Sequence, residues 1–271
     1  TRLVRSLATC LSIQKLFDRN ANLDKFNVAD YWSHSLLVGE MARGIAELAE
    51  YPHPDEAYLS GLLHDIGELI LLSAIGDPYH RFLANSLENP KLQSEELQLF
   101  GTTHADVGGW LIDHWGLDSV LADGVAFHHT AATEIVTATA LPQIVWIAQA
   151  LSVTPDNSPE LGMVVNRSNP KLEMSALLVV RERAIQRARQ IAEALGITIA
   201  DDFPNRRTAA PVAASSLPEP ASAADDDLAT LVGGMALLQP LQQDLFHLGS
   251  DTEVLLALRE SARILLDLPK V

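Results

Sequence analysis

Apolar residues recur at every third or fourth position along most of the chain, and this spacing predicts a fold built from α-helices. Between Val28 and Ala49, the residues that would line one helical face are Trp32, Leu36, Leu37, Met41, Ile45 and Leu48. The alternation of apolar and polar residues that is typical of a β-strand is rare. We therefore expect an all-α protein: a helical bundle followed by a linker and a C-terminal helical segment.

Further helices are predicted by the same spacing together with start and stop signals. Their expected ranges are 55–73, 103–116, 120–129, 141–153 and 172–195. The 55–73 helix is apolar on most sides, so we expect it to be buried at the centre of the bundle. Thr103 and Asp106 form a capping-box pattern at the start of the next range, and Gly116 is a typical helix stop.

The composition changes after residue 200, which divides the chain into three parts. Residues 1–200 hold the helical patterns described above, whereas residues 201–227 are rich in Pro, Ala, Ser and Asp, as linkers are. Residues 228–271 return to two amphipathic helices, with a near-heptad seam of Leu228, Leu231, Met235, Leu238, Leu245 and Leu248. We expect this segment to form a homodimer contact or to lead into a sensory domain. Because the chain starts in mid-helix without Met, we also expect it to be an excerpt of a longer protein.

The charge balance excludes some classes of partner. The chain carries 19 Lys and Arg against 35 Asp and Glu, a formal net charge of −16. Nucleic acids and anionic membranes are bound by clustered basic residues, so we expect neither as a partner. Cys10 is the only cysteine, which rules out an internal disulfide, and the sequence shows no signal peptide. These features favour a cytoplasmic location.

Six ligand-type residues occur on four predicted helices: His34, His64, Asp65, His104, His128 and His129. Imidazole nitrogens and carboxylates are common ligands of divalent metals, and helices that converge on one point can supply them together. We therefore expect a metal centre for Fe, Mn, Mg or Zn. Such an ion could activate water and stabilise negative charge on a phosphate group. The alternative is that these histidines form a hydrogen-bonded core network without a metal.

The remaining histidines and the tryptophans are expected to be core residues. They are His53, His80, His114, His247, Trp32, Trp110, Trp115 and Trp146. Glu68 and Asp106 lie near the ligand-type residues in the sequence. We expect them to accept hydrogen bonds that hold the imidazole rings in place.

Several of these segments resemble known proteins. Trp32-Ser-His34 and Gly61-Leu-Leu-His64-Asp65-Ile-Gly67 resemble the HD superfamily of phosphohydrolases. Three more segments resemble its HDOD subgroup, the HD-related output domain of bacterial signalling proteins: Thr103-His104-Ala-Asp-Val-Gly108, His114-Trp115-Gly116-Leu117 and Phe127-His128-His129. The resemblance covers about residues 1–195 and implies an HD-superfamily-like helical bundle with a preceding helical lobe. Residues 228–271 resemble the lead-in of a GAF-type sensory domain.

The chain departs from the active HD pattern at three points. Gln149 stands at the position of the closing Asp ligand, and Glu68 stands where the related HD-GYP enzymes, which cleave cyclic di-GMP, have a Lys. Thr130-Ala-Ala-Thr replaces their Gly-Tyr-Pro loop. Gln is neutral and a weaker metal ligand than Asp, so the resemblance implies a degenerate site. Most HDOD domains have no established catalytic activity.

Three functions are compatible with these features. The first is a signal-transduction output module, as in two-component regulation, which relays a state change from an attached receiver or sensory domain to a partner signalling protein. The second is a metal-dependent phosphohydrolase or phosphodiesterase acting on a nucleotide or cyclic dinucleotide, with Glu68 or Asp65 in a catalytic role. In the third, the site binds a nucleotide ligand without cleaving it.

Overall fold

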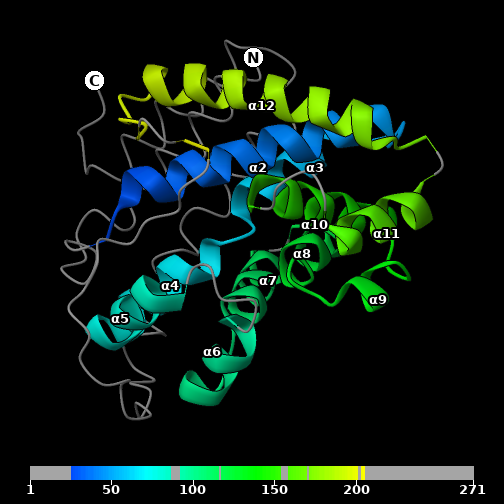
Figure 1. Cartoon of the computed structure of the whole chain (residues 1–271). Coiled ribbons are helices and arrows are strands. Elements are labelled where there is room, and N and C mark those ends of the chain that lie inside the picture. The colour runs from blue at the N-terminus through cyan, green and yellow to red at the C-terminus, as the bar shows by residue number, and fades with distance from the viewer. Residues whose placement is uncertain are drawn as a thin grey trace, which may run out of the picture. The chain divides into compact units, whose positions relative to one another are not determined.

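The computed structural model describes residues 26–86, 92–115, 117–153, 158–169, 171–200 and 203–204. They belong to one compact unit, Asn22–Ala223. In these ranges every regular element is a helix (Figure 1), which confirms the all-α prediction. The predictions for Cys10, His247, the 228–271 segment and the 201–227 linker lie outside the described residues, apart from residues 203–204, and stay predictions.

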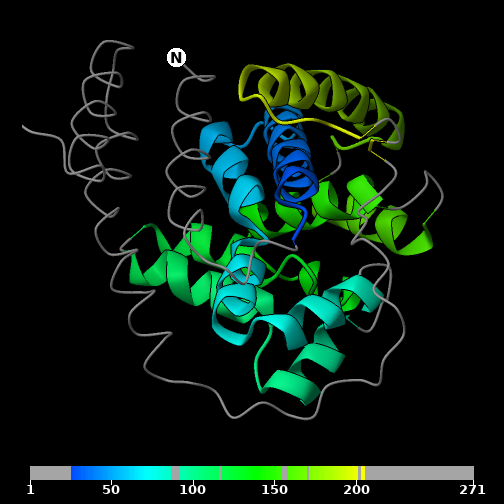
Figure 2. The same cartoon turned by 90° about the vertical axis from the view of Figure 1, so that its left-hand side faces the viewer.

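The helices follow one another with short connections. They are α2 (Val28–Leu48), α3 (Pro54–Leu63), α4 (Ile66–Ile75), α5 (Asp77–Ser86), α6 (Leu92–Phe100), α7 (His104–His114), α8 (Ser119–Ala126), α9 (Ala132–Ile135), α10 (Ala140–Val153), α11 (Pro159–Ser168) and α12 (Met174–Ala194). Helix α2 packs against α3, α10 and α12, and α8 packs against α3, α7 and α10. Figures 1 and 2 show α12 lying along α2, with α4, α5 and α6 on the side of the unit away from α12.

Helix α2 forms as predicted, because its N-terminus is capped and its length is buried. The side chain of Asn27 accepts a hydrogen bond from the Asp30 backbone N–H at 3.2 Å, which satisfies one of the free donors of the first turn. Its packing against α3 is close: a Cβ on Gly61 would lie 2.9 Å from the Val38 carbonyl oxygen. This close approach brings the end of α3 to the middle of α2.

The single helix predicted at 55–73 is wrong, because the chain turns at His64 and Asp65. Helix α3 ends at Leu63 and α4 begins at Ile66. The turn directs α4 onto α7, where a Cβ on Gly67 would lie 1.9 Å from the His104 carbonyl oxygen. Only glycine permits this backbone contact. The break therefore arises from packing against a distant helix, which local spacing does not predict.

The two helices on either side of this turn form the core, as expected. The segment Pro54–Ile75 has a mean hydropathy of 1.3 and would be long enough to cross a bilayer, but 89% of its most apolar stretch is buried inside the unit. Burial against other helices accounts for its apolar composition. The segment therefore belongs to the interior of the domain.

The expected core positions are confirmed in part. Four are buried: Trp32, His80, Trp115 and Trp146. His53 and His114 are exposed, and Trp110 is 49% exposed, so for these three the prediction is wrong. Trp110 and His114 are one helical turn apart on the outer face of α7, and their rings stack with centroids 5.1 Å apart.

Candidate metal centre

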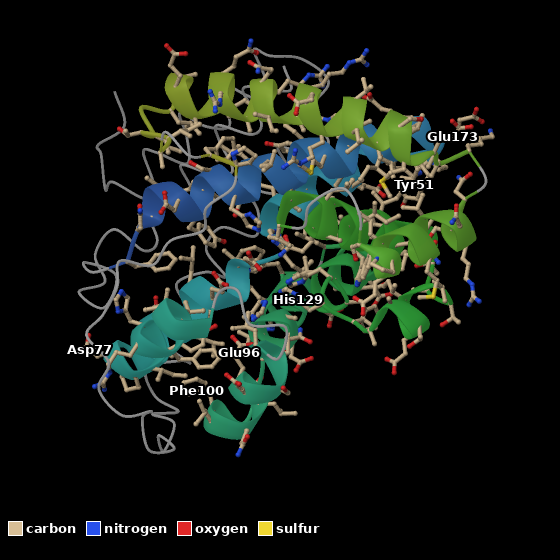
Figure 3. All side chains as sticks on the ribbon, viewed as in Figure 1. Tyr51, Asp77, Glu96, Phe100, His129 and Glu173 are labelled. Atoms are coloured by element: carbon tan, nitrogen blue, oxygen red, sulfur yellow. The ribbon has the colours of Figure 1, made fainter. Side chains whose placement is uncertain are left out.

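The structure brings the six predicted ligand-type residues together from four parts of the unit. His34 lies on α2, His64 and Asp65 form the turn between α3 and α4, and His104 is the first residue of α7. The turn directly after α8 supplies His128 and His129. Three of the four parts are therefore turns or helix ends, where backbone direction changes and side chains can converge. Figure 3 labels His129 and, on α6, Glu96.

Asp65 stands at the centre of the cluster. Its Oδ2 lies 3.0 Å from His64 Nε2 and 3.6 Å from His34 Nε2. Its Oδ1 lies 3.4 Å from His128 Nε2 and 3.6 Å from His104 Nε2. One buried carboxylate thus faces two pairs of imidazoles, one pair at each oxygen.

The imidazole rings form a continuous group around this carboxylate. The centroid of the His64 ring lies 5.1 Å from that of His34 and 4.9 Å from that of His128. The His129 ring lies 4.2 Å from the His128 ring and 5.1 Å from the His104 ring. His129 Nε2 is buried and has no hydrogen-bond partner among the described residues. A buried nitrogen of this kind is a candidate metal ligand.

Hydrogen bonds on the far side of the rings set their orientation. His64 Nδ1 lies 2.8 Å from the Gly61 carbonyl oxygen, and His128 Nδ1 lies 2.5 Å from the Val125 carbonyl oxygen. In a neutral ring, an Nδ1–H that donates to an acceptor leaves the lone pair on Nε2. Both rings therefore present Nε2 to Asp65, as metal-binding histidines do.

His104 is oriented in the same way by Glu96, which sequence reasoning missed. Glu96 is fully buried and accepts hydrogen bonds from His104 Nδ1 at 2.8 Å, the His104 backbone N–H at 3.1 Å and the Tyr79 hydroxyl at 2.5 Å. Glu96 follows Leu92 by one helical turn and so falls on the same apolar face, which was the sequence pattern that could have indicated its burial. The expected role of Asp106 is wrong, because this exposed residue caps α7 with Thr103.

The pKa values of the histidines differ with their surroundings. Burial alone would lower the pKa of His104, but the hydrogen bond and charge of Glu96, with the charges of Asp65 and Glu68, outweigh it and raise this pKa from 6.5 to about 9. Burial lowers the pKa of His128 to about 4, although Asp65 opposes the shift. Burial and the neighbouring histidines also hold the pKa of His129 well below 6.5. His128 and His129 are therefore neutral, as metal ligands must be, whereas His104 would have to release a proton on binding a metal.

Gln149 contacts the cluster directly, and Glu68 acts on it through its charge. Gln149, on α10, places its Oε1 3.0 Å from His34 Nε2, so the side chain at the position of the closing Asp does contact the predicted ligands. Glu68 lies in the first turn of α4, is 1% exposed, and acts on His104 through its charge. The cluster thus contains three buried acidic groups, Asp65, Glu68 and Glu96.

The residues present fit a divalent metal. Two groups have ligand atoms within 4.8 Å of one another: one comprises Asp65, His104, His128 and His129, and the other comprises His34, His64 and Asp65. A donor set of several imidazoles and one carboxylate suits Zn, Fe or Mn better than Mg, which prefers oxygen ligands. An ion bound there would act as a Lewis acid.

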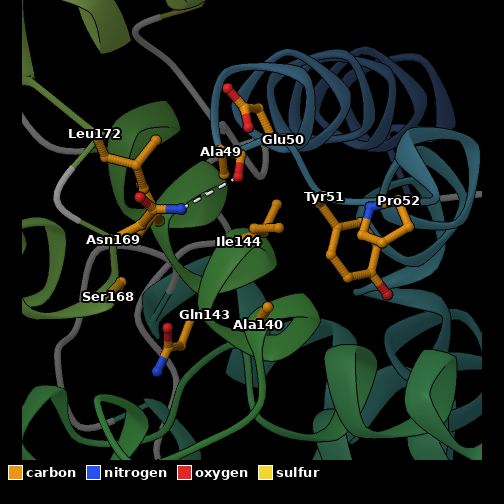
Figure 4. A pocket seen from close by; sticks show the side chains of 11 residues that line it. Ala49, Glu50, Tyr51, Pro52, Ala140, Gln143, Ile144, Ser168, Asn169 and Leu172 are labelled. Atoms are coloured by element: carbon orange, nitrogen blue, oxygen red, sulfur yellow. Dashed lines mark hydrogen bonds between the residues drawn. The ribbon is translucent and has the colours of Figure 1, made fainter.

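A cavity of about 210 Å³ opens away from this cluster. The connection between α2 and α3, the first half of α10, the end of α11 and the connection between α11 and α12 line it. Figure 4 shows Ile144 between Asn169 on one side and Tyr51 on the other. None of its lining residues belongs to the His–Asp cluster.

Fold and cluster together define an all-helical domain with a buried His–Asp centre at a junction of helices. The model of the HDOD domain family matches residues 1–131, just under half of the chain. The matched range contains all six cluster residues, from His34 to His129. Gln149 lies beyond it.

One solved structure shows the same fold, and a second is less similar. A crystal structure of an HDOD domain protein with unknown function from Geobacter sulfurreducens has 24% sequence identity and a TM-score of 0.54, covering 69% of this chain and 68% of that chain. A second, described as a "putative phosphohydrolase" from Shewanella amazonensis SB2B, has 22% identity and a TM-score of 0.49, covering 62% of this chain and 66% of that chain. No curated protein matches the chain.

Proposed function

We propose that the chain is a regulatory output module of bacterial signalling that does not hydrolyse a substrate and acts through contact with partner proteins. The hydrogen-bond contact of 3.0 Å between Gln149 Oε1 and His34 Nε2 carries this proposal. A closing carboxylate would add negative charge and a strong ligand at this point, whereas an amide adds neither. The neutral side chain of Gln149 instead forms a hydrogen bond with His34 Nε2.

The burial of the cluster supports the same function. His64, Asp65 and His104 are fully buried, His128 is 2% exposed and His34 is 8% exposed. A hydrolytic metal centre needs open positions for water and substrate. Here the ligand-type groups face one another across 3.0 to 3.6 Å, which favours a centre that holds helices together.

The partners and the location follow from this role and are part of the proposal. A cytoplasmic module of this kind would receive a signal from an attached receiver or sensory domain and transmit it to another signalling protein. The His–Asp centre joins α2, α4, α7 and the end of α8, so a change at the centre would alter how these helices pack. The 228–271 segment would supply a homodimer contact or the start of a sensory domain.

A metal-dependent phosphohydrolase is the second candidate, and one observation favours it. All six ligand-type residues converge, with Asp65 shared between two groups. A pair of ions in such a centre could bind both oxygens of a phosphodiester during displacement. Glu68 or Asp65 would then take the catalytic roles.

Hydrolysis assays separate the two candidates. The protein is loaded in turn with Mn, Fe, Mg and Zn and incubated with nucleotides and cyclic dinucleotides, including cyclic di-GMP, and products are separated by chromatography. We expect no product above that of His64→Ala protein prepared in parallel. Product that forms with the wild-type chain and disappears in His64→Ala would establish the phosphohydrolase instead. Thermal shift with the same nucleotides tests binding without cleavage.

A further inference from the structure

The two groups of ligands around Asp65 are not equivalent. The Oδ2 side holds His34 and His64, and Gln149 contacts it; the Oδ1 side holds His104 and His128, with His129 beside them. We propose that the cluster binds one divalent transition-metal ion, on the Oδ1 side, and that Gln149 closes the Oδ2 side. This inference deepens the proposed function and rests on it, since it concerns what the non-hydrolytic centre holds.

On the Oδ2 side, Gln149 occupies the nitrogen that a metal would need. With Oε1 toward His34, the ring must carry a proton on Nε2 and donate it, which leaves no lone pair there. If the amide were turned over, its NH₂ would donate into that lone pair, with the same result. In either orientation, a metal ion would have to displace this hydrogen bond to reach His34 Nε2, and without His34 only His64 and Asp65 remain on this side.

On the Oδ1 side, the Nε2 atoms of His104 and His128 lie 3.3 Å apart in a hydrogen-bond contact, so a metal ion bound there would displace the proton that they share. Glu96 and the Val125 carbonyl oxygen hold the Nδ1 atoms of His104 and His128, so both Nε2 atoms point to the same space. One ring nitrogen of His129 lies within 4.8 Å of the ligand atoms of Asp65, His104 and His128, and its Nε2 is buried without a hydrogen-bond partner among the described residues. Leaving a buried polar atom unsatisfied costs about 1–3 kcal/mol, which a metal ligand bond would remove.

The spacing of these atoms matches a tetrahedral ion. Two ligands bound at 2.0–2.1 Å with a tetrahedral angle between them lie about 3.3–3.4 Å apart. His104 Nε2 and His128 Nε2 are 3.3 Å apart, and they lie 3.6 and 3.4 Å from Asp65 Oδ1. Three ligands thus already have nearly the separation that Zn²⁺ or Co²⁺ requires, with His129 as the fourth.

Metal counting with matched variants tests this inference. Purified protein is stripped with chelator, titrated with Co²⁺ and with Zn²⁺, and analysed for bound metal per chain and for the Co²⁺ absorption spectrum. We expect one ion per chain with a tetrahedral spectrum. His129→Ala should weaken binding by more than the about 10- to 100-fold that loss of a supporting hydrogen bond causes. His34→Ala should retain the ion, and His53→Ala, on the exposed surface, serves as the control.

Gln149→Asp should raise the metal count to two, because the carboxylate restores a ligand and releases His34. Crystals of the wild-type chain soaked in Co²⁺ give a readout that needs no variant: an anomalous peak between Asp65, His104, His128 and His129. Two ions in the wild-type chain, no ion at all, a peak between His34 and His64, or loss of metal in His34→Ala alone would each overturn the inference. A Gln149→Asp count that stays at one would overturn the role of Gln149.

The result of metal counting can be distinguished from the result of the hydrolysis assays. One ion per chain together with product formation would refute the regulatory function and leave the metal assignment standing. Two ions in a chain that forms no product would refute the metal assignment alone.

Discussion

Gly67 is the residue at which the backbones of α4 and α7 meet beside the metal centre. We expect Gly67→Ala to destabilise the fold by about 1–3 kcal/mol, because the added Cβ would lie 1.9 Å from the rigid His104 carbonyl oxygen and force the helices apart. Gly162→Ala, in α11 with nothing within 4 Å of the new Cβ, should stabilise by about 0.5–1 kcal/mol. Urea denaturation measures both, and equal stabilities would contradict the close packing.

Glu96 is expected to support the centre through His104. Glu96→Gln places an NH₂ group against one of three buried donors, so the free energy of unfolding should fall by about 1–3 kcal/mol. Metal affinity should fall about 10- to 100-fold, as it does when a histidine ligand loses its carboxylate partner. Glu182→Gln on the exposed face of α12 is the control. Unchanged Zn²⁺ affinity in a titration of Glu96→Gln would refute this role.

At the scale of helices, Trp146 connects α10 to the turn that carries His128 and His129. Its Nε1–H donates to the Thr130 carbonyl oxygen at 2.8 Å. Trp146→Phe keeps most of the apolar contact and loses this bond, so local opening of residues 127–131 should become easier by about 0.5–1.5 kcal/mol. Hydrogen exchange there should quicken by about 2- to 10-fold.

The matched control for this variant is Trp110→Phe. Trp110 is 49% exposed on the outer face of α7, where its ring stacks on His114. Exchange in residues 127–131 should therefore stay at the wild-type rate. Similar acceleration in both variants would mean that Trp146 has no specific effect on the histidine turn.

Elements with a strong local signal could be predicted from the sequence. The periodic spacing gave α2, α10 and α12 nearly at their observed bounds, and the Thr103–Asp106 cap of α7 forms as expected. The convergence of the six ligand-type residues followed from the family resemblance. The turn at His64 and Asp65 could not be predicted, because it depends on a contact between α4 and α7 that is distant in the sequence. The role of Glu96 was missed because a carboxylate is expected to be exposed unless its buried partners, here His104 and Tyr79, are known.

At the scale of the whole domain, a metal ion bound at the His–Asp centre would link α4, α7 and the turn after α8. Removal of the ion should therefore loosen the domain. Saturating Zn²⁺ at 100 times its Kd should add about 2.7 kcal/mol to the free energy of unfolding, and chelation should remove this increment. Thermal unfolding with and without chelator measures it, and identical curves would show that the ion does not stabilise the folded state.

The central claim is that this centre does not hydrolyse phosphodiesters, and single-turnover kinetics test it most directly. When metal-loaded protein is in excess over cyclic di-GMP, neither slow product release nor weak binding can account for a lack of hydrolysis. We expect the substrate to decay no faster with the wild-type chain than with His64→Ala. Decay that is complete with the wild-type chain and absent in His64→Ala would contradict it.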